Sequence, residues 1–137
     1  MDKERKKRCK EKIALANDRL NLIEETLSEF EDEKLKLACY KAFQEAVEVV
    51  TDLIAMILVD KNKIIEDDYS NINKIKNLLN LSEEETIIIR EANGLRNRLV
   101  HKYNRTDDNT AKESIINLLS KLKIIIDKFE KIIENAK

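Results

Sequence analysis

Apolar residues recur every three or four positions along most of the chain, and this spacing favours helices. In the first part they stand in an otherwise charged stretch, at Ile13, Ala16, Leu20, Ile23, Leu27 and Phe30. Because an α-helix has 3.6 residues per turn, such positions form a single apolar stripe along one side. A similar rhythm returns near the end of the chain, at Ile115, Leu118, Leu119, Leu122, Ile125, Ile126, Phe129, Ile132 and Ile133. The pattern predicts long amphipathic helices.

The residues that interrupt helices are almost missing from the sequence. It contains no proline and one glycine, whereas 39% of its residues are charged and 4% are aromatic. That mixture favours helices over strands. The length of 137 residues is typical of one domain and allows a core large enough to be stable without a disulfide or a structural metal. We therefore expect residues 1–137 to form a single helical domain.

Five helices can be placed on the sequence. Glu31 and Asp32 break the first stripe, and a second helix is expected over about residues 33–60. Its apolar residues, which begin at Leu37, lie on more than one side, so this helix is predicted to be central. A short third helix is expected near residues 70–79, after a connecting segment.

The last two helices have recognisable starting signals. Ser82 followed by Glu85 is typical of a capping box, in which each side chain satisfies the other's backbone N–H. Asp107 or Asp108 begins the last helix. Apolar stripes of this kind are buried against one another, and short connections make consecutive helices antiparallel. The fold class is therefore expected to be all-α, an antiparallel four- to five-helix bundle.

Charge and composition bear on several classes of function. The formal charge is −1, so the whole molecule has no strong field for nucleic acid or membrane. Residues 1–12 are locally basic, which indicates a solvated helix start or, alternatively, an arm that contacts phosphates. The longest apolar run, residues 53–59, is too short to span a membrane. Cys9 and Cys39 match no metal-binding spacing. We expect a cytoplasmic protein with no membrane anchor, no metal and no cofactor.

The stretch "GLRNRLVHKYN", residues 94–104, contains both the only glycine and the only histidine. On a helix, Asn97 and His101 share a face, and Leu95 with Leu99 can anchor the segment to the core. Arg96 and His101 lie about 140° apart on an ideal helix. They can still converge if the helix deforms near its end, if the long arginine reaches around, or if a second copy of the chain completes the site.

Gly94 is unusual in a chain that otherwise lacks glycine. It costs a helix about 1 kcal/mol relative to alanine, which suggests a steric reason for its presence. One interpretation is that a bare Cα lets another helix or a substrate backbone come close. The other is a local break in the helix.

The side chains of this stretch could cleave RNA without a metal. His101 would accept the proton of a ribose 2′-hydroxyl as that oxygen attacks the adjacent phosphorus, because imidazole titrates near neutrality. Arg96 would stabilise the charge that develops on the phosphoryl oxygens, and Asn97 could orient either group. The alternative is structural, since a lone histidine is more often a packing or surface residue and arginines near a helix end often interact with the helix dipole.

Asp52 interrupts the apolar run "VVTDLIAMIL", and burial of a free carboxylate is costly. It either orients a side chain of the 94–104 stretch, or lines a cleft, or occupies an exposed position on a helix with one wet side. Gln44, Glu45 and Glu48 are interpreted as ordinary residues of a polar face.

The segment "RNRLVHKY" resembles the Arg-x4-His-x-Tyr motif of HEPN-domain proteins of the HepT type, the toxin half of MNT–HEPN toxin–antitoxin pairs. The similarity extends beyond the motif. "YKAFQEAVEVVTDLIAMIL" resembles the second helix of that family, and the later segments follow its layout up to the final helix. The resemblance covers about residues 15–135.

This resemblance implies a HEPN-like bundle that forms a homodimer, with motif copies facing one another in a cleft between subunits. Active members are metal-independent endoribonucleases, so Arg96 and His101 would be catalytic, and Asn97 would fill the polar position after the arginine. An MNT-type nucleotidyltransferase antitoxin would be the partner and could attach AMP to Tyr103. Lys102 departs from the small or acidic residue of many members, which puts the RNA affinity in doubt. We expect the Gly94 face to lie between the chains.

Two other classes of function remain open on the sequence. One is a catalytically inactive binding module for a nucleotide or a nucleotidyltransferase partner, which the near-neutral charge favours because most RNA-handling proteins have a broad basic surface. The other is a purely structural helical bundle, which leaves the clustering around Gly94 unexplained.

Overall fold

The computed structural model of the protein describes residues 1–101 and 107–136. Over these residues the regular secondary structure is five α-helices, and no strand occurs. The helices are α1 (Lys3–Leu27), α2 (Glu33–Asp60), α3 (Asp68–Leu79), α4 (Glu83–Val100) and α5 (Asp108–Glu134). The expected all-α fold class is confirmed. Among the described residues, no helix is long and apolar enough to cross a membrane.

Each helix begins at a polar residue whose side-chain oxygen accepts a backbone N–H of the first turn. The capping residues are Asp2, Asp32, Asp67, Ser82 and Asp107. At the start of α4 the capping box is complete: the Glu85 N–H donates to the Ser82 hydroxyl at 3.0 Å, and the Ser82 N–H donates to the Glu85 carboxylate at 2.9 Å. Capping of this kind satisfies N–H groups that have no partner inside the helix.

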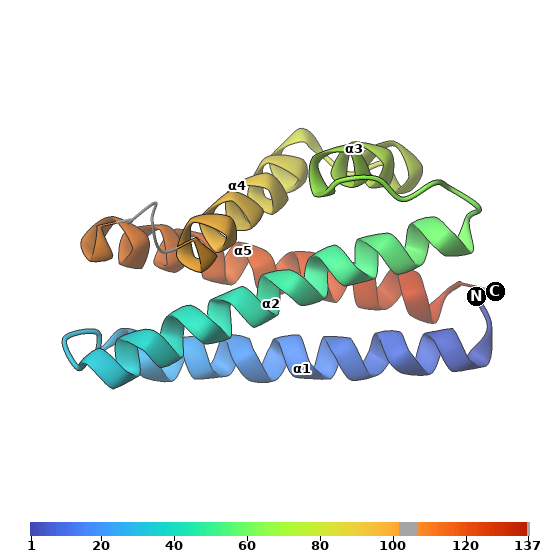
Figure 1. The fold of residues 1–137 in the computed structure, drawn as a ribbon. Coiled ribbons are helices and arrows are strands. Elements are labelled where there is room, and N and C mark those ends of the chain that lie inside the picture. Colours follow the sequence, from blue (N-terminus) through green and yellow to red (C-terminus); the bar gives the residue numbers. More distant parts are fainter. Residues whose placement is uncertain (102–106, 137) are drawn as a thin grey trace.

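Helix α2 is the centre of the bundle, as its wide apolar surface predicts. It packs against all four other helices, whereas α1 packs only against α2 and α5. Figure 1 shows α1 along one side of α2 and α5, with α3 and α4 on the opposite side. Helices α1 and α2 run antiparallel, and α5 runs back along them so that the two chain ends lie close together.

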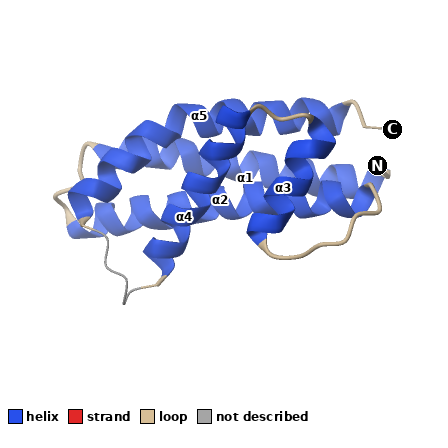
Figure 2. Ribbon diagram, turned by 90° about the horizontal axis from the view of Figure 1, so that it is seen from above, coloured by secondary structure: helices blue, strands red, loops and turns tan. Residues whose placement is uncertain are grey.

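Helices α3 and α4 form a hairpin that crosses the long helices. Figure 2 shows the two lying side by side, at an angle to α1, α2 and α5. The segment before α3 is held by Asn71, whose buried amide accepts the Glu66 N–H at 2.8 Å and donates to the Glu66 carbonyl at 3.1 Å. This pair of bonds fixes where α3 begins, and therefore the position of its first residue, Asp68.

The core is one continuous apolar cluster drawn from all five helices. Phe43 of α2 and Phe129 of α5 are fully buried within it. Two details differ from the sequence pattern. Helix α1 ends at Leu27, and Phe30 is buried from the turn that follows instead of from the helix. Leu37, which the sequence pattern places among the apolar residues of α2, is exposed.

Candidate active site

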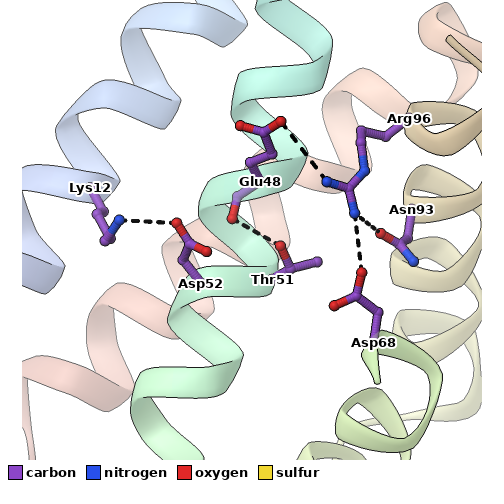
Figure 3. A network of polar contacts seen from close by, with 7 residues as sticks. All are labelled: Lys12, Glu48, Thr51, Asp52, Asp68, Asn93 and Arg96. Carbon is purple, nitrogen blue, oxygen red and sulfur yellow. Dashed lines mark hydrogen bonds and ion pairs between the residues drawn. The ribbon is translucent and has the colours of Figure 1, made fainter. Parts of the chain in front are cut away.

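Arg96 lies in α4 with its side chain directed at α2 and α3. Its Nη2 donates to the Asp68 carboxylate at 3.1 Å and to the Asn93 side-chain oxygen at 2.7 Å, and its Nη1 lies 3.9 Å from a Glu48 carboxylate oxygen (Figure 3). Three helices therefore contribute to one guanidinium. Because a guanidinium presents its donors in a rigid plane, contacts on two sides restrict the orientation of that plane.

These contacts orient Arg96 more than they stabilise the fold. The Arg96 side chain is 15% exposed, but those of Glu48 and Asp68 are 48% and 43% exposed. Ion pairs with this much exposure contribute about 0–1 kcal/mol. The Arg96 Nε is buried and has no hydrogen-bond acceptor among the described residues. The guanidinium is thus held in place without all of its donors being satisfied.

Sequence reasoning missed the residues that hold Arg96. Glu48 was interpreted as part of a polar face, and neither Asp68 nor Asn93 was recognised. Asn93 had a visible signal, because it stands three residues before Arg96 and so shares its side of the helix. Asp68 had none, because its approach to Arg96 depends on how α3 folds against α4.

His101 is the residue at which α4 ends. Its backbone N–H still donates to the Asn97 carbonyl at 3.1 Å, but its φ and ψ of −88° and 95° are those of extended chain. The residue is exposed. The angular separation expected on an ideal helix therefore does not apply to its side chain. Along the axis, His101 lies about 7.5 Å beyond Arg96.

Two other predicted site residues belong to the same region. Asn97 is exposed on α4, and the asparagine that contacts Arg96 is Asn93 instead. Tyr103, the predicted site of modification, lies outside the described residues.

Asp52 is not brought to Arg96. It is exposed and its carboxylate accepts from Lys12 of α1 at 3.0 Å. Figure 3 shows that Asp52 and Glu48 leave α2 in different directions, Asp52 towards α1 and Glu48 towards Arg96. The structure supports the interpretation of Asp52 as an exposed helix position, and the acids that contact a motif side chain are Glu48 and Asp68.

Comparison with known proteins identifies the family of this chain. The model of the family described as "Ribonuclease HepT-like" matches residues 10–129, which include both Arg96 and His101. The chain belongs to the HepT-like ribonuclease family.

Similar proteins have names that agree with this family. A protein of Archaeoglobus fulgidus named "Putative RNase" is 38% identical over 103 residues, which is 75% of this chain and 76% of that protein. A second protein of the same organism and name is 36% identical over 91 residues, 66% of each chain. A protein of Methanocaldococcus jannaschii, also named as a "Putative RNase", is 35% identical over 66 residues, 48% of this chain and 76% of its own.

Gly94 of the HepT-like chain does not break its helix. Helix α4 continues through it to Val100, and its φ is not positive, so the interpretation as a local break is wrong. Among the described residues, a Cβ built at Gly94 would meet the Arg98 guanidinium at an ordinary 3.6 Å, and no atom of another helix lies within 4 Å of it. No steric clash between described residues therefore requires a glycine at this position.

A polar cluster joins the start of α5 to α2 next to the segment that contains Tyr103. The Tyr40 hydroxyl donates to Asp108 at 2.5 Å, and Lys36 donates to the other oxygen of Asp108 at 2.9 Å. These bonds lower the pKa of Asp108. Burial, together with the bond to Asp108, raises the pKa of Tyr40 well above its usual range. In this HepT-like chain the cluster fixes the point at which the chain re-enters the bundle after the motif.

We expect Tyr40→Phe to change how stability depends on pH. The raised pKa of Tyr40 means that the neutral phenol stabilises the fold below about pH 10, and that this contribution is lost as the pH rises. The lowered pKa of Asp108 acts in the opposite range, since its contribution is present above about pH 4 and is lost in acid.

The measurement is urea unfolding at a series of pH values. Between about pH 9 and 12, the free energy of unfolding should fall more steeply for the wild type than for Tyr40→Phe. Tyr69→Phe is the matched control, because Tyr69 is 64% exposed, and it should follow the wild type. Equal slopes for the wild type and Tyr40→Phe would show that the pKa of Tyr40 is not raised in solution, and would contradict both its burial and its bond to Asp108.

Proposed function

We propose that this protein is a metal-independent endoribonuclease toxin, acting in the cytoplasm with Arg96 and His101 as its catalytic pair. His101 takes the proton from a ribose 2′-hydroxyl while that oxygen bonds to the adjacent phosphorus, and the bond from phosphorus to the 5′-oxygen breaks. Arg96 stabilises the negative charge on the non-bridging oxygens. The leaving 5′-oxygen takes up a proton to become a hydroxyl.

The proposal depends on one observation: the chain belongs to a ribonuclease family, and its Arg96 guanidinium is held in a fixed orientation. Residues 10–129 match the family, and in that range Asp68, Asn93 and Glu48 hold the guanidinium from two sides. Donors that are oriented before the substrate arrives stabilise a developing charge without reorganisation during the reaction. Asn97, next to Arg96 and four residues before His101, is a supporting residue in this proposal.

The proposal includes a homodimer with the two motifs facing a shared cleft. Arg96 is directed at α2 and α3, whereas His101 stands at the exposed end of α4. A second copy that adds its own motif would enclose the substrate between two pairs. Light scattering that finds only monomer at micromolar concentration contradicts this part.

The proposed partner is an MNT-type nucleotidyltransferase antitoxin that attaches AMP to Tyr103. Added bulk and negative charge two residues from His101 would repel the phosphate of RNA, which supplies a physical reason for neutralisation. Mass analysis of the Tyr103 peptide, after incubation with the partner and ATP, should show the mass of one added AMP. An unmodified peptide would remove this step from the proposal.

A specific observation favours a second candidate, a binding module that does not cleave RNA. The charge of Arg96 is already matched by Glu48 and Asp68. An RNA phosphate must displace one of these acids or bind beside them. If the phosphate can neither displace an acid nor bind beside the acids, the protein would bind a nucleotide or a nucleotidyltransferase without cleaving RNA.

One assay separates the two candidates. Purified protein is incubated with single-stranded RNA in the presence of EDTA, and the products are separated by length. The ribonuclease proposal expects internal cuts that EDTA does not prevent. Intact RNA, together with tight binding of the nucleotidyltransferase partner, would select the binding module.

A further inference from the structure

A second group of polar side chains lies on a different side of α4 from the Arg96 network. It lines a pocket of about 480 Å³ between α4 and α5. Two arginines and one acid line its α4 wall, together with Gly94 and Leu95, and the α5 wall is Ser114, Asn117 and Leu118; the charged residues are Arg90, Glu91 and Arg98. None of these residues contributes to the catalytic pair described above.

The two arginines of this pocket are not neutralised as Arg96 is. Among the described residues, neither Arg90 nor Arg98 forms an ion pair with a carboxylate. Arg90 donates to the Asn73 side-chain oxygen and stacks on the Tyr69 ring at 4.9 Å, so two neutral groups of α3 hold its guanidinium. Its Nε is buried and has no acceptor among these residues. The pocket therefore contains donors and positive charge that a bound anion could use.

Gly94 keeps the pocket open between the two arginines. The Arg98 guanidinium folds over its bare Cα, at 3.6 Å from where a Cβ would stand. A side chain much larger than that of alanine would displace the Arg98 guanidinium and fill part of the pocket.

The pocket also leads to His101. Arg90, Gly94 and Arg98 are spaced by four residues, so they lie along one face of α4. Arg98 stands three residues before His101, the residue at which α4 ends, so the pocket lies about 4.5 Å along the helix axis from it. Arg96, in contrast, faces α2 and α3. If an RNA strand places one phosphate beside His101, the next phosphate along the strand would reach the pocket.

We propose that this pocket binds a backbone phosphate of the RNA strand next to the link that is cleaved. Arg98 and Arg90 supply the charge, and the Ser114 hydroxyl and the Asn117 amide supply further donors. The inference rests on the proposed ribonuclease function, since RNA is the substrate in both. In the expected dimer the pocket forms part of the wall of the cleft.

The first test measures binding, so that it does not depend on cleavage. Fluorescence anisotropy with a short labelled single-stranded RNA compares His101→Ala with His101→Ala/Arg98→Gln over a range of salt. Loss of one phosphate contact should weaken binding roughly tenfold at low salt and reduce the salt slope by about 0.7. His101→Ala/Arg8→Gln is the matched control, because Arg8 is an exposed arginine in the first turns of α1, a helix that does not pack against α4.

The second test measures cleavage with Arg98→Gln alone. A dinucleotide has only the link that is cut, so its rate should not change. A longer RNA should show a higher KM with the same kcat, because it loses the neighbouring contact.

Three results would overturn the proposal. One is an equal loss of binding in the Arg98 and Arg8 variants, which would indicate general charge. Another is a loss of dinucleotide cleavage in Arg98→Gln, which would place Arg98 at the reacting link. The third is unchanged RNA binding, with binding of the nucleotidyltransferase partner lost instead. Absence of any cleavage by the wild type would refute the ribonuclease proposal. The binding test would still show whether the pocket binds a phosphate of RNA.

Discussion

Replacement of His101 by alanine should lower the rate of RNA cleavage by about 10²–10³-fold. In the proposed reaction no other group in the motif can accept the 2′-hydroxyl proton near neutral pH, because a guanidinium stays protonated. The fold should be unaffected, since His101 is exposed at the end of α4 and its backbone N–H, which alanine keeps, makes the last helical hydrogen bond. The measurement is the initial rate on single-stranded RNA with EDTA present.

The control for this variant is Ile87→Ala. Ile87 is 44% exposed on the same helix, so its replacement should leave both the rate and the thermal unfolding midpoint near those of the wild type. If His101→Ala cuts RNA as fast as the wild type does, the assigned mechanism is wrong. If its unfolding midpoint also falls, the lost rate reflects a damaged fold, and the chemical role of His101 is not supported.

Replacement of Phe43 by alanine should lower the free energy of unfolding by about 3–5 kcal/mol. Phe43 is fully buried in α2, the helix that packs against all four others. Removal of its ring loses apolar burial and leaves a cavity that rigid neighbouring helices cannot fill. A loss of this size is a large part of the stability of an ordinary domain.

Urea unfolding monitored by helical circular dichroism measures this loss. Phe43→Leu should unfold at an intermediate concentration, and it keeps the prediction testable if the alanine variant does not fold. Leu37→Ala is the matched control on the same helix, because Leu37 is 54% exposed, and its change should stay within about 0.5 kcal/mol. A cost below about 1 kcal/mol for Phe43→Ala would contradict the central position of α2.

The helices could be predicted because their signals are local. The stripe through Ile13, Leu20 and Ile23 is buried as expected, and the Ser82–Glu85 capping box starts α4 at the expected place. Both signals depend on residues within a few turns of one another. The predicted end of α1 was wrong, since Phe30 fits the spacing of the stripe but is buried from the turn that follows the helix.

The surroundings of the motif could not be predicted in the same way. Asp52 interrupts an apolar run, which suggested a role beside the motif, yet its partner is Lys12. Glu48, one turn earlier on α2, approaches Arg96 instead. Only the direction in which each side chain leaves α2 distinguishes the two acids, and that depends on which helices cover each side.

The sequence by itself determined the five helices, the central place of α2 and the clustering of chemical groups at 94–104, because periodicity, capping and spacing act within single segments. Only the tertiary structure decided which acids hold Arg96, that the Arg98 guanidinium lies beside Gly94, and that Arg90 and Arg98 line a pocket with α5. The contact between Asp68 and Arg96 joins residues 28 positions apart. Such a contact exists only after the α3–α4 hairpin has packed across α2, since burial of the apolar faces sets where polar side chains meet.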